Sequence, residues 1–176
     1  MRSLLFILVG VLFFSFPANA AVKVRRMEIK TKYTEKEIKK TDYSEYFSPE
    51  DVEILACTIH NEAGGIPSKM EQSAVAWCAI NRFVQWGYNT LADVLRDPGQ
   101  FASWYSAYTS EEYKLAEDVC KRATIEMNRD IPVNVGRTLP TEYLYFGGDG
   151  AHNHFRCEFA SFGNYWDWSW GSPYAT

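Results

Sequence analysis

The sequence has neither a hydrophobic run long enough to cross a membrane comfortably nor an excess of positive charge. Its most apolar stretch, Leu4–Phe16, is shorter than the roughly 20 residues that a membrane-spanning helix needs. The 176 residues carry a formal net charge of −4 at pH 7, whereas a nucleic-acid-binding domain is typically basic. We therefore expect no nucleic acid among the partners of this protein.

Metal-binding motifs are also missing. None of the four cysteines belongs to a C-x-x-C pair, and the H-E-x-x-H motif of zinc peptidases is absent. The sequence has no internal repeat and no low-complexity segment. We expect neither a metal nor another cofactor and, with about 130 residues from Ser48 onward, a single domain.

The first twenty residues have the features of an export signal. Arg2 supplies positive charge, Leu4–Phe16 is an apolar segment, and Ala18-Asn19-Ala20 is a small-residue cleavage site. We predict a signal peptide over residues 1–20 that is cleaved after Ala20, and hence a secreted or periplasmic protein. An uncleaved membrane anchor is the alternative.

An exported protein folds in an oxidising compartment, where cysteines commonly pair. The sequence therefore predicts two disulfides, for which three pairings are possible. The residues concerned are Cys57, Cys78, Cys120 and Cys157.

Charge divides the remaining chain into two parts. Residues 21–47 hold eight Lys and Arg against five Asp and Glu, whereas residues 48–176 are acidic overall. We predict a basic, poorly ordered arm over residues 21–47 and a folded domain over residues 48–176. The arm could contact an anionic cell envelope weakly, or act only as a solvated tether.

Helix signals dominate the first part of the domain. Capping residues and apolar periodicity predict helices from Ser48 to Gly64, over residues 69–86, over residues 91–96 and from Thr109 to about residue 128. The second helix is apolar or small on nearly every side, which is typical of a central helix. The β-prone residues 142–146 and 154–159 flank a glycine-rich loop and predict an antiparallel hairpin. The expected fold class is α+β and mainly helical.

One acidic residue stands out in the first predicted helix. Val52, Leu55, Ile59 and Glu62 follow at i, i+3, i+7 and i+10, so the Glu62 carboxylate points the same way as core residues. A carboxyl group in an apolar wall keeps its proton more readily than an exposed one, which suits a proton donor to a glycosidic oxygen. If this face is misassigned by one residue, Glu62 is an ordinary surface acid.

The segment around Glu62 resembles a known family. The stretches "IHNEAGGIP" and "EQSAVAWCAINRF" are similar to the opening motif of the cell-wall hydrolase family that includes the spore cortex-lytic enzymes, which reads E-A-R-G-E-P, then G-Q-x-A-V-A and a run ending in N-R. The later stretches "TLADVLRDPGQFA" and "YLYF" also resemble family segments, so the resemblance covers about Val52 to Phe155. Gly64, Ile66 and Glu71 stand where the family usually has arginine, an acid and glycine.

This resemblance implies a lysozyme-like domain that cleaves the β-1,4 bond between N-acetylmuramic acid and N-acetylglucosamine in peptidoglycan. Glu62 falls on the family's catalytic glutamate. As a lytic transglycosylase, it would act first as acid and then as base, and one carboxyl group suffices. Hydrolysis would need a second carboxylate at roughly 5–9 Å; the candidates are Asp149 first, and Glu142 and Glu158. The transglycosylase route is the favoured prediction.

Five further residues are predicted to bind substrate. Gln100 and Phe101 match the family's Q-F pair and would line a sugar groove, unless they are a turn and a core ring. Tyr143 and Tyr145 alternate with Leu144 and Phe146, so one pair should face the core and the other the solvent. His154 lies in a stretch that matches a short N-H-x-F-like strand of the family with a shift.

Two rival classes remain open at this point. His60, His152 and His154 with Glu62 would be a possible zinc site of an amidase or peptidase, although His60 and Glu62 point in different directions on a helix. Trp166, Trp168 and Trp170 alternate as on an exposed strand face, which would fit a non-catalytic carbohydrate-binding module. Tryptophans near a terminus more often fill a small core.

Overall fold

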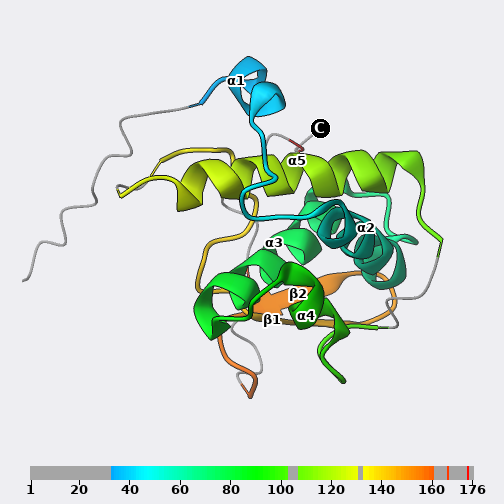
Figure 1. The fold of residues 1–176 in the computed structure, drawn as a ribbon. Helices are drawn as coiled ribbons and strands as arrows, with labels where there is room; N and C mark the ends of the chain where they lie inside the picture. Colours follow the sequence, from blue (N-terminus) through cyan, green and yellow to red (C-terminus); the bar gives the residue numbers. More distant parts are fainter. Residues whose placement is uncertain (1–32, 103–106, 131–132, 161–165, 167–173, 175–176) are drawn as a thin grey trace, which may run out of the picture.

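A computed structural model describes residues 33–102, 107–130 and 133–160, together with residues 166 and 174. Over these residues the chain is mainly helical and carries one two-stranded antiparallel sheet, which confirms the α+β class (Figure 1). The elements in chain order are α1 (Glu35–Lys40), α2 (Pro49–Ala63), α3 (Lys69–Trp86), α4 (Leu91–Arg96), α5 (Ser110–Met127), β1 (Tyr145–Gly148) and β2 (Asn153–Arg156).

The predicted helix starts are confirmed, because each is set by a local cap. In α2, the Ser48 hydroxyl accepts a hydrogen bond from the Asp51 amide, and the Asp51 carboxylate bonds back to the Ser48 amide. The same capping box starts α4 at Thr90 and α5 at Thr109. Such boxes satisfy amide groups that have no partner within the helix.

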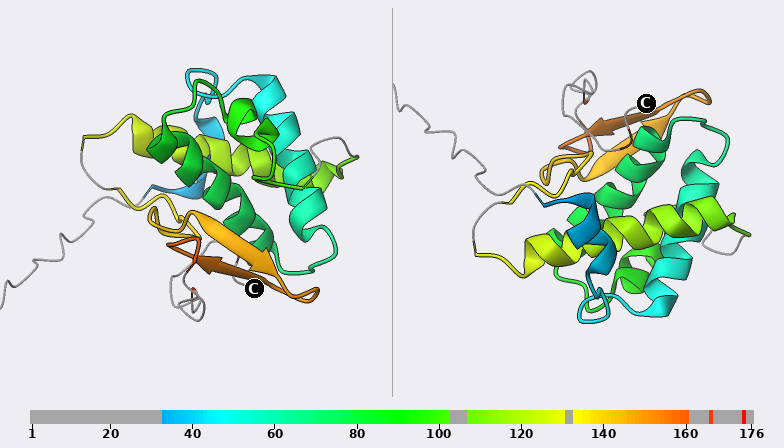
Figure 2. Two further views of the ribbon diagram at one scale, coloured as in Figure 1. Left: turned by 90° about the horizontal axis from the view of Figure 1, so that it is seen from below. Right: turned by 90° about the horizontal axis from the view of Figure 1, so that it is seen from above.

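Helix α3 is the centre of the molecule, as its all-round apolar sequence predicted. Residues 73–82 are all buried, and Trp77 is the largest fully buried side chain. Helix α3 packs against α2, α4 and α5, and it lies between α5 and the hairpin (Figure 2). One side of α3 therefore faces the helical core, and the hairpin covers another.

Both strands are shorter than the sequence predicted: β1 begins three residues later than expected, and β2 begins one residue earlier and ends three residues earlier. Phe146 pairs with Phe155 and Gly148 with Asn153 across the two strands. Residues 142–144 fall outside β1, because side chains of α3 bind the carbonyls of this segment. The Asn81 amide donates to the Tyr143 carbonyl at 2.8 Å, and the Arg82 guanidinium donates to the Leu144 carbonyl at 2.6 Å.

The predicted arm over residues 21–47 needs correction. Residues 33–47 are folded: α1 places Ile38 in the core, and Phe47 is equally buried. The α1 carboxylate of Glu35 also pairs with the buried Arg122 of α5 at 2.7 Å. The folded unit thus begins before Ser48. Residues 21–32 and the predicted signal peptide lie outside the described residues, and no described helix is both long and apolar enough to cross a membrane.

The predicted disulfides are absent. All four cysteines lie in the described part of the chain, and none is bonded to another. Their surroundings differ: Cys78 lies near Arg82 and Glu62, Cys120 near Asp51, and Cys157 near Glu142. Burial raises the pKa of the Cys78 thiol to about 12 and that of Cys120 well above its usual value, so both are unreactive while the protein is folded.

Candidate functional site

Glu62 lies in the last turn of α2, at the edge of the core. Val52, Leu55 and Ile59 on the same face are fully buried, while Glu62 is partly exposed. Its Oε1 atom accepts a short hydrogen bond from the backbone amide of Ala102, in the segment that follows α4. The carboxylate is therefore neither deeply buried nor loose in solvent, and it is fixed to a second chain segment.

Side chains from α3 and β2 hold the end of α2. The side-chain amide of Asn153 donates a hydrogen bond to the backbone carbonyl of Glu62 at 2.9 Å. The side-chain amide of Gln72 donates to the backbone carbonyls of Ala63 at 3.3 Å and Ile66 at 2.8 Å. The last carbonyls of a helix have no partner within it, so these bonds fix the direction in which Glu62 leaves the helix.

Glu71, which sequence analysis did not assign to the site, supports Asn153. It is buried, and its carboxylate accepts a short hydrogen bond from the Asn153 backbone amide and contacts Nδ1 of His152 at 3.2 Å. An acid three residues after Ser68 is the pattern of a capping box, which would keep the side chain at the helix start. The Ser68 hydroxyl does accept from the Glu71 amide, but the Glu71 carboxylate binds β2.

Arg82 joins α3 to residues 100–102, which bind Glu62, and to Leu144, which precedes β1. This buried guanidinium donates to the carbonyl of Gln100 at 2.9 Å and to its side-chain Oε1 at 3.2 Å, besides the bond to Leu144. It also lies 4.5 Å from the Phe101 ring centroid and 5.6 Å from that of Tyr145. Arg82 thereby positions the segment whose next residue, Ala102, binds Glu62. In the sequence, Arg82 stands out only as part of a family-like motif.

The structure brings three predicted substrate-binding residues together. Gln100, Phe101 and Tyr145 all contact Arg82, and all three are partly exposed. Phe101 also packs against Phe146, with ring centroids 6.1 Å apart. Phe101 thus contributes to the core and to the surface beside Glu62.

Tyr143 does not share this place. It packs against the core and against Trp166, with ring centroids 5.3 Å apart. The predicted alternation of Tyr143 and Tyr145 with Leu144 and Phe146 fails because β1 begins only at Tyr145. Tyr143 and Phe146 therefore both contact the core. Trp166 packs there too, while Trp168 and Trp170 lie outside the described residues.

Asp149 and His154 pair with each other at the hairpin loop. His154 Nε2 lies 2.8 Å from Asp149 Oδ2, and the Asp149 carboxylate also accepts from the amides of Ala151 and His152 at 2.8 Å. These hydrogen bonds, with His154 first, hold the pKa of Asp149 well below its usual range. Asp149 is thus an ionised carboxylate that shapes the loop. Glu142 and Glu158, the other candidates, are exposed.

The three histidines do not form the zinc site considered above. His60 faces Glu112 at 3.1 Å, His152 faces Glu71, and His154 faces Asp149. Burial raises the pKa of Glu112, but hydrogen bonds from Thr109 and His60 outweigh it and leave this pKa lowered. Among the described residues, no group of three His, Cys, Asp or Glu side chains is arranged to hold a metal.

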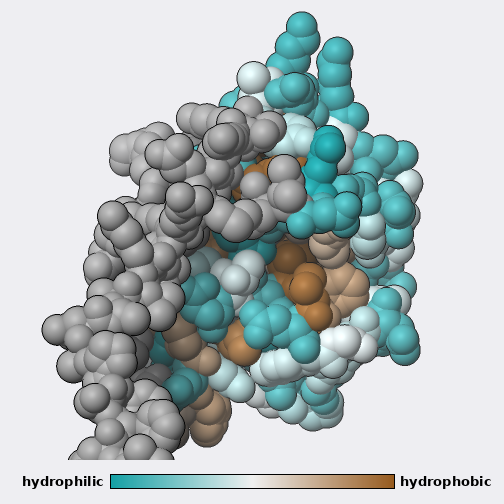
Figure 3. Space-filling model, turned by 90° about the vertical axis from the view of Figure 1, so that its left-hand side faces the viewer, coloured by the Kyte–Doolittle hydropathy of each residue, from teal (hydrophilic) through white to brown (hydrophobic). Residues whose placement is uncertain are grey.

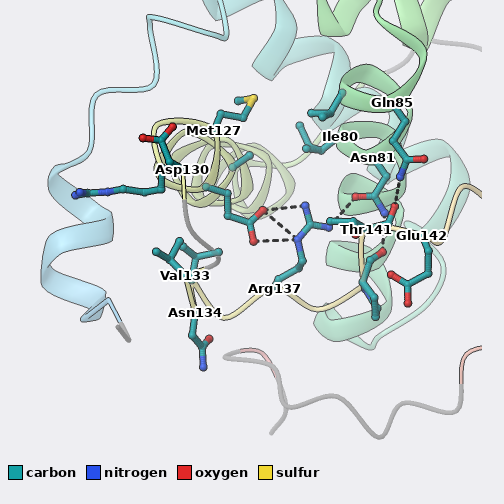
Figure 4. A pocket seen from close by; sticks show the side chains of 16 residues that line it. Ile80, Asn81, Gln85, Met127, Asp130, Val133, Asn134, Arg137, Thr141 and Glu142 are labelled. Atoms are coloured by element: carbon teal, nitrogen blue, oxygen red, sulfur yellow. Dashed lines mark hydrogen bonds and ion pairs between the residues drawn. The ribbon is translucent and has the colours of Figure 1, made fainter. Parts of the chain in front are cut away.

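A pocket of about 700 Å³ lies elsewhere, between the C-terminal halves of α3 and α5 and the segment 133–142 (Figure 4). Arg137 crosses it, bonds to the Glu126 carboxylate at 2.9 Å and to Asn81 at 2.7 Å, and stacks on Trp77. Figure 3 shows hydrophobic surface on this side of the molecule, surrounded by hydrophilic side chains. Glu62 is not among the lining residues. The charges of Arg137 and Glu126 satisfy each other, so this pair offers no free reacting group.

Comparisons with models of known protein families, with curated proteins and with solved structures found no match. The family resemblance, and the lysozyme-like fold that it implies, thus stay predictions from sequence motifs.

Proposed function

We propose that this protein is an exported enzyme that cleaves the β-1,4 bond between N-acetylmuramic acid and N-acetylglucosamine in peptidoglycan, with Glu62 as its catalytic acid and base. The observation that carries the proposal is the position of the Glu62 carboxylate, half-buried at a helix end and held by the Ala102 amide. Such a carboxylate can exchange a proton with a bound sugar while its direction stays fixed.

The motifs behind the family resemblance support this proposal. Gln72 holds the end of the Glu62 helix, Arg82 holds Gln100, and Gln100 precedes the segment that binds Glu62. Residues from two family-like stretches thus hold the end of α2 and residues 100–102, and these two segments meet at the Glu62 carboxylate. In the proposed fold, the helical domain with its hairpin is of the lysozyme-like type.

The proposed reaction is that of a lytic transglycosylase. Oε1 of Glu62 accepts from Ala102, which leaves Oε2 to carry the proton. That proton passes to the glycosidic oxygen as the bond to C1 of muramic acid breaks. The muramic 6-hydroxyl oxygen then bonds to C1, and its proton returns to Glu62. The product is a 1,6-anhydro ring, and no water is consumed.

A hydrolytic muramidase is the second candidate, because Asp149 is an ionised carboxylate in the hairpin loop. Three donors already occupy its oxygens. An ionised carboxylate has about four lone-pair positions, so at most one of those on Asp149 is left to aim at a water. We therefore prefer the transglycosylase route, which requires only Glu62.

Replacing Glu62 by Gln tests the assignment, since the amide keeps the shape and removes the transferable proton. We expect E62Q to lose turbidity clearing of purified cell walls. The matched control is E53Q, an exposed acid of the same helix, which should clear at the parent's rate. Clearing by E62Q at that rate would exclude Glu62 as the catalytic group.

A further inference from the structure

An exposed aromatic surface extends from the neighbourhood of Glu62. We define it as Trp86, Tyr145 and Phe159. The Tyr145 ring centroid lies 6.1 Å from that of Trp86 and 5.7 Å from that of Phe159. Phe159 is 73% exposed, the highest value among the large hydrophobic side chains of the described residues that are exposed, and the other two rings are partly exposed.

This aromatic surface is continuous with the site around Glu62. Cys78, Arg82 and Trp86 follow at i, i+4 and i+8 and so share one face of α3. The Ala102 amide binds the Glu62 carboxylate, and the neighbouring Phe101 ring lies 4.5 Å from the Arg82 guanidinium. Trp86 is two turns beyond Cys78, about 12 Å along the helix axis. Arg82, between them, contacts the Trp86 ring at 5.3 Å and the Tyr145 ring at 5.6 Å.

We propose that the aromatic surface binds the glycan strand at sugar rings beyond the pair whose bond Glu62 cleaves. The inference rests on the proposed function. Its chemistry is that of an aromatic ring against the C–H face of a pyranose, which buries apolar area on both partners and leaves the sugar hydroxyls in water. A peptidoglycan strand is the occupant that reaches both the aromatic surface and Glu62, because it is a long chain of such rings.

The proposal predicts discrimination by substrate length. A short oligosaccharide around Glu62 does not reach Phe159, whereas a long strand does. Contacts remote from the reacting bond stabilise the enzyme–substrate complex and the transition state equally. Their loss therefore raises KM and leaves kcat unchanged.

The variant F159A tests this directly, because Phe159 is exposed and its ring contacts are with Tyr145 and the Arg156 guanidinium, at the far end of the aromatic surface from Arg82. For long glycan strands freed of peptides, we expect a roughly 3- to 10-fold higher KM at unchanged kcat. For a tetrasaccharide, KM should stay at the parent's value. The control Y108A removes another exposed aromatic ring, which stacks on Tyr113 away from this surface, and should change neither.

An unchanged KM of F159A for long strands, or an equal rise for both substrates, would overturn the proposal. A second measurement separates the proposal on the aromatic surface from the proposed function. It compares the binding of long strands to E62Q and to the double variant E62Q/F159A. If E62Q is inactive but F159A does not weaken binding, only the aromatic surface is wrong. If E62Q still cleaves while F159A weakens binding, the aromatic surface stands and the role of Glu62 does not.

Discussion

The side-chain amide of Asn153 donates a hydrogen bond to the backbone carbonyl of Glu62 at 2.9 Å. These two residues are 91 positions apart in the sequence, one at the start of β2 and the other at the end of α2. The hairpin therefore does more than cover α3, because it fixes the helix end that carries the proposed catalytic group.

Removing this link should affect both stability and activity. Asn153 is buried, so N153A leaves the Glu62 carbonyl without its donor, and we expect a loss of about 1–3 kcal/mol in the free energy of unfolding. Clearing of cell walls by the folded variant should also slow. Urea unfolding of N153A beside N89A, which removes an exposed asparagine side chain, measures the first effect. Equal unfolding midpoints for the two variants would show that the bond contributes nothing.

Arg82 should not tolerate lysine. A lysine has one ammonium group, which cannot replace the forked guanidinium that binds Leu144 and Gln100 together. We expect R82K to fold but to let the segment at Ala102 shift, and kcat to fall roughly 10- to 100-fold. The exposed Arg129 gives the matched control R129K, which should retain its activity. Full activity of R82K would contradict this role.

Asp149 should make stability depend on pH in the acid range. Its pKa is lowered in the folded protein, chiefly by the hydrogen bond from His154, whereas in the unfolded chain it is about 3.9. The carboxylate therefore contributes stability above about pH 4, and this contribution is lost as the pH falls further, because the unfolded chain takes up the proton first. The melting temperatures of the parent and D149N should differ at pH 6 and converge toward pH 2. A difference that does not change with pH would count against this account.

The cysteines give a test of the structure itself. If alkylation is carried out without a reducing agent, Cys157 should be labelled in the folded protein, since it is partly exposed. Cys78 and Cys120 should be labelled only after unfolding, since both are buried. Mass spectrometry counts the labels. Cysteines that resist labelling in denaturant until they are reduced would restore the two disulfides that the sequence alone predicted.

Features set by neighbouring residues could be predicted from the sequence. The cap of α2 needs only Ser48 and Asp51, and the central position of α3 follows from its own apolar residues. α1 also has a complete capping box, from Thr34 to Glu37. The many charges of this segment are nevertheless typical of a solvated arm, and the burial of Ile38 depends on packing of the folded chain and not on its own neighbours.

The site depended on partners that no local pattern reveals. The pattern at Glu71 is that of a helix cap, but its carboxylate binds the amide of Asn153, 82 positions later. Arg82 has the same property, since its partners at Gln100 and Leu144 come from two later segments. The alternation predicted for residues 143–146 does not hold at Tyr143, because one residue separates it from the start of β1 and the alternation of a strand does not extend beyond its hydrogen bonds.

The central claim is that Glu62 alone carries the reaction. Mass spectrometry of the fragments released from purified peptidoglycan tests it most directly, because ring closure by the muramic 6-hydroxyl gives a product that lacks one water relative to hydrolysis. We predict 1,6-anhydromuramic acid ends from the parent protein and none from E62Q. Fully hydrated ends, or the same fragments from E62Q, would contradict the account.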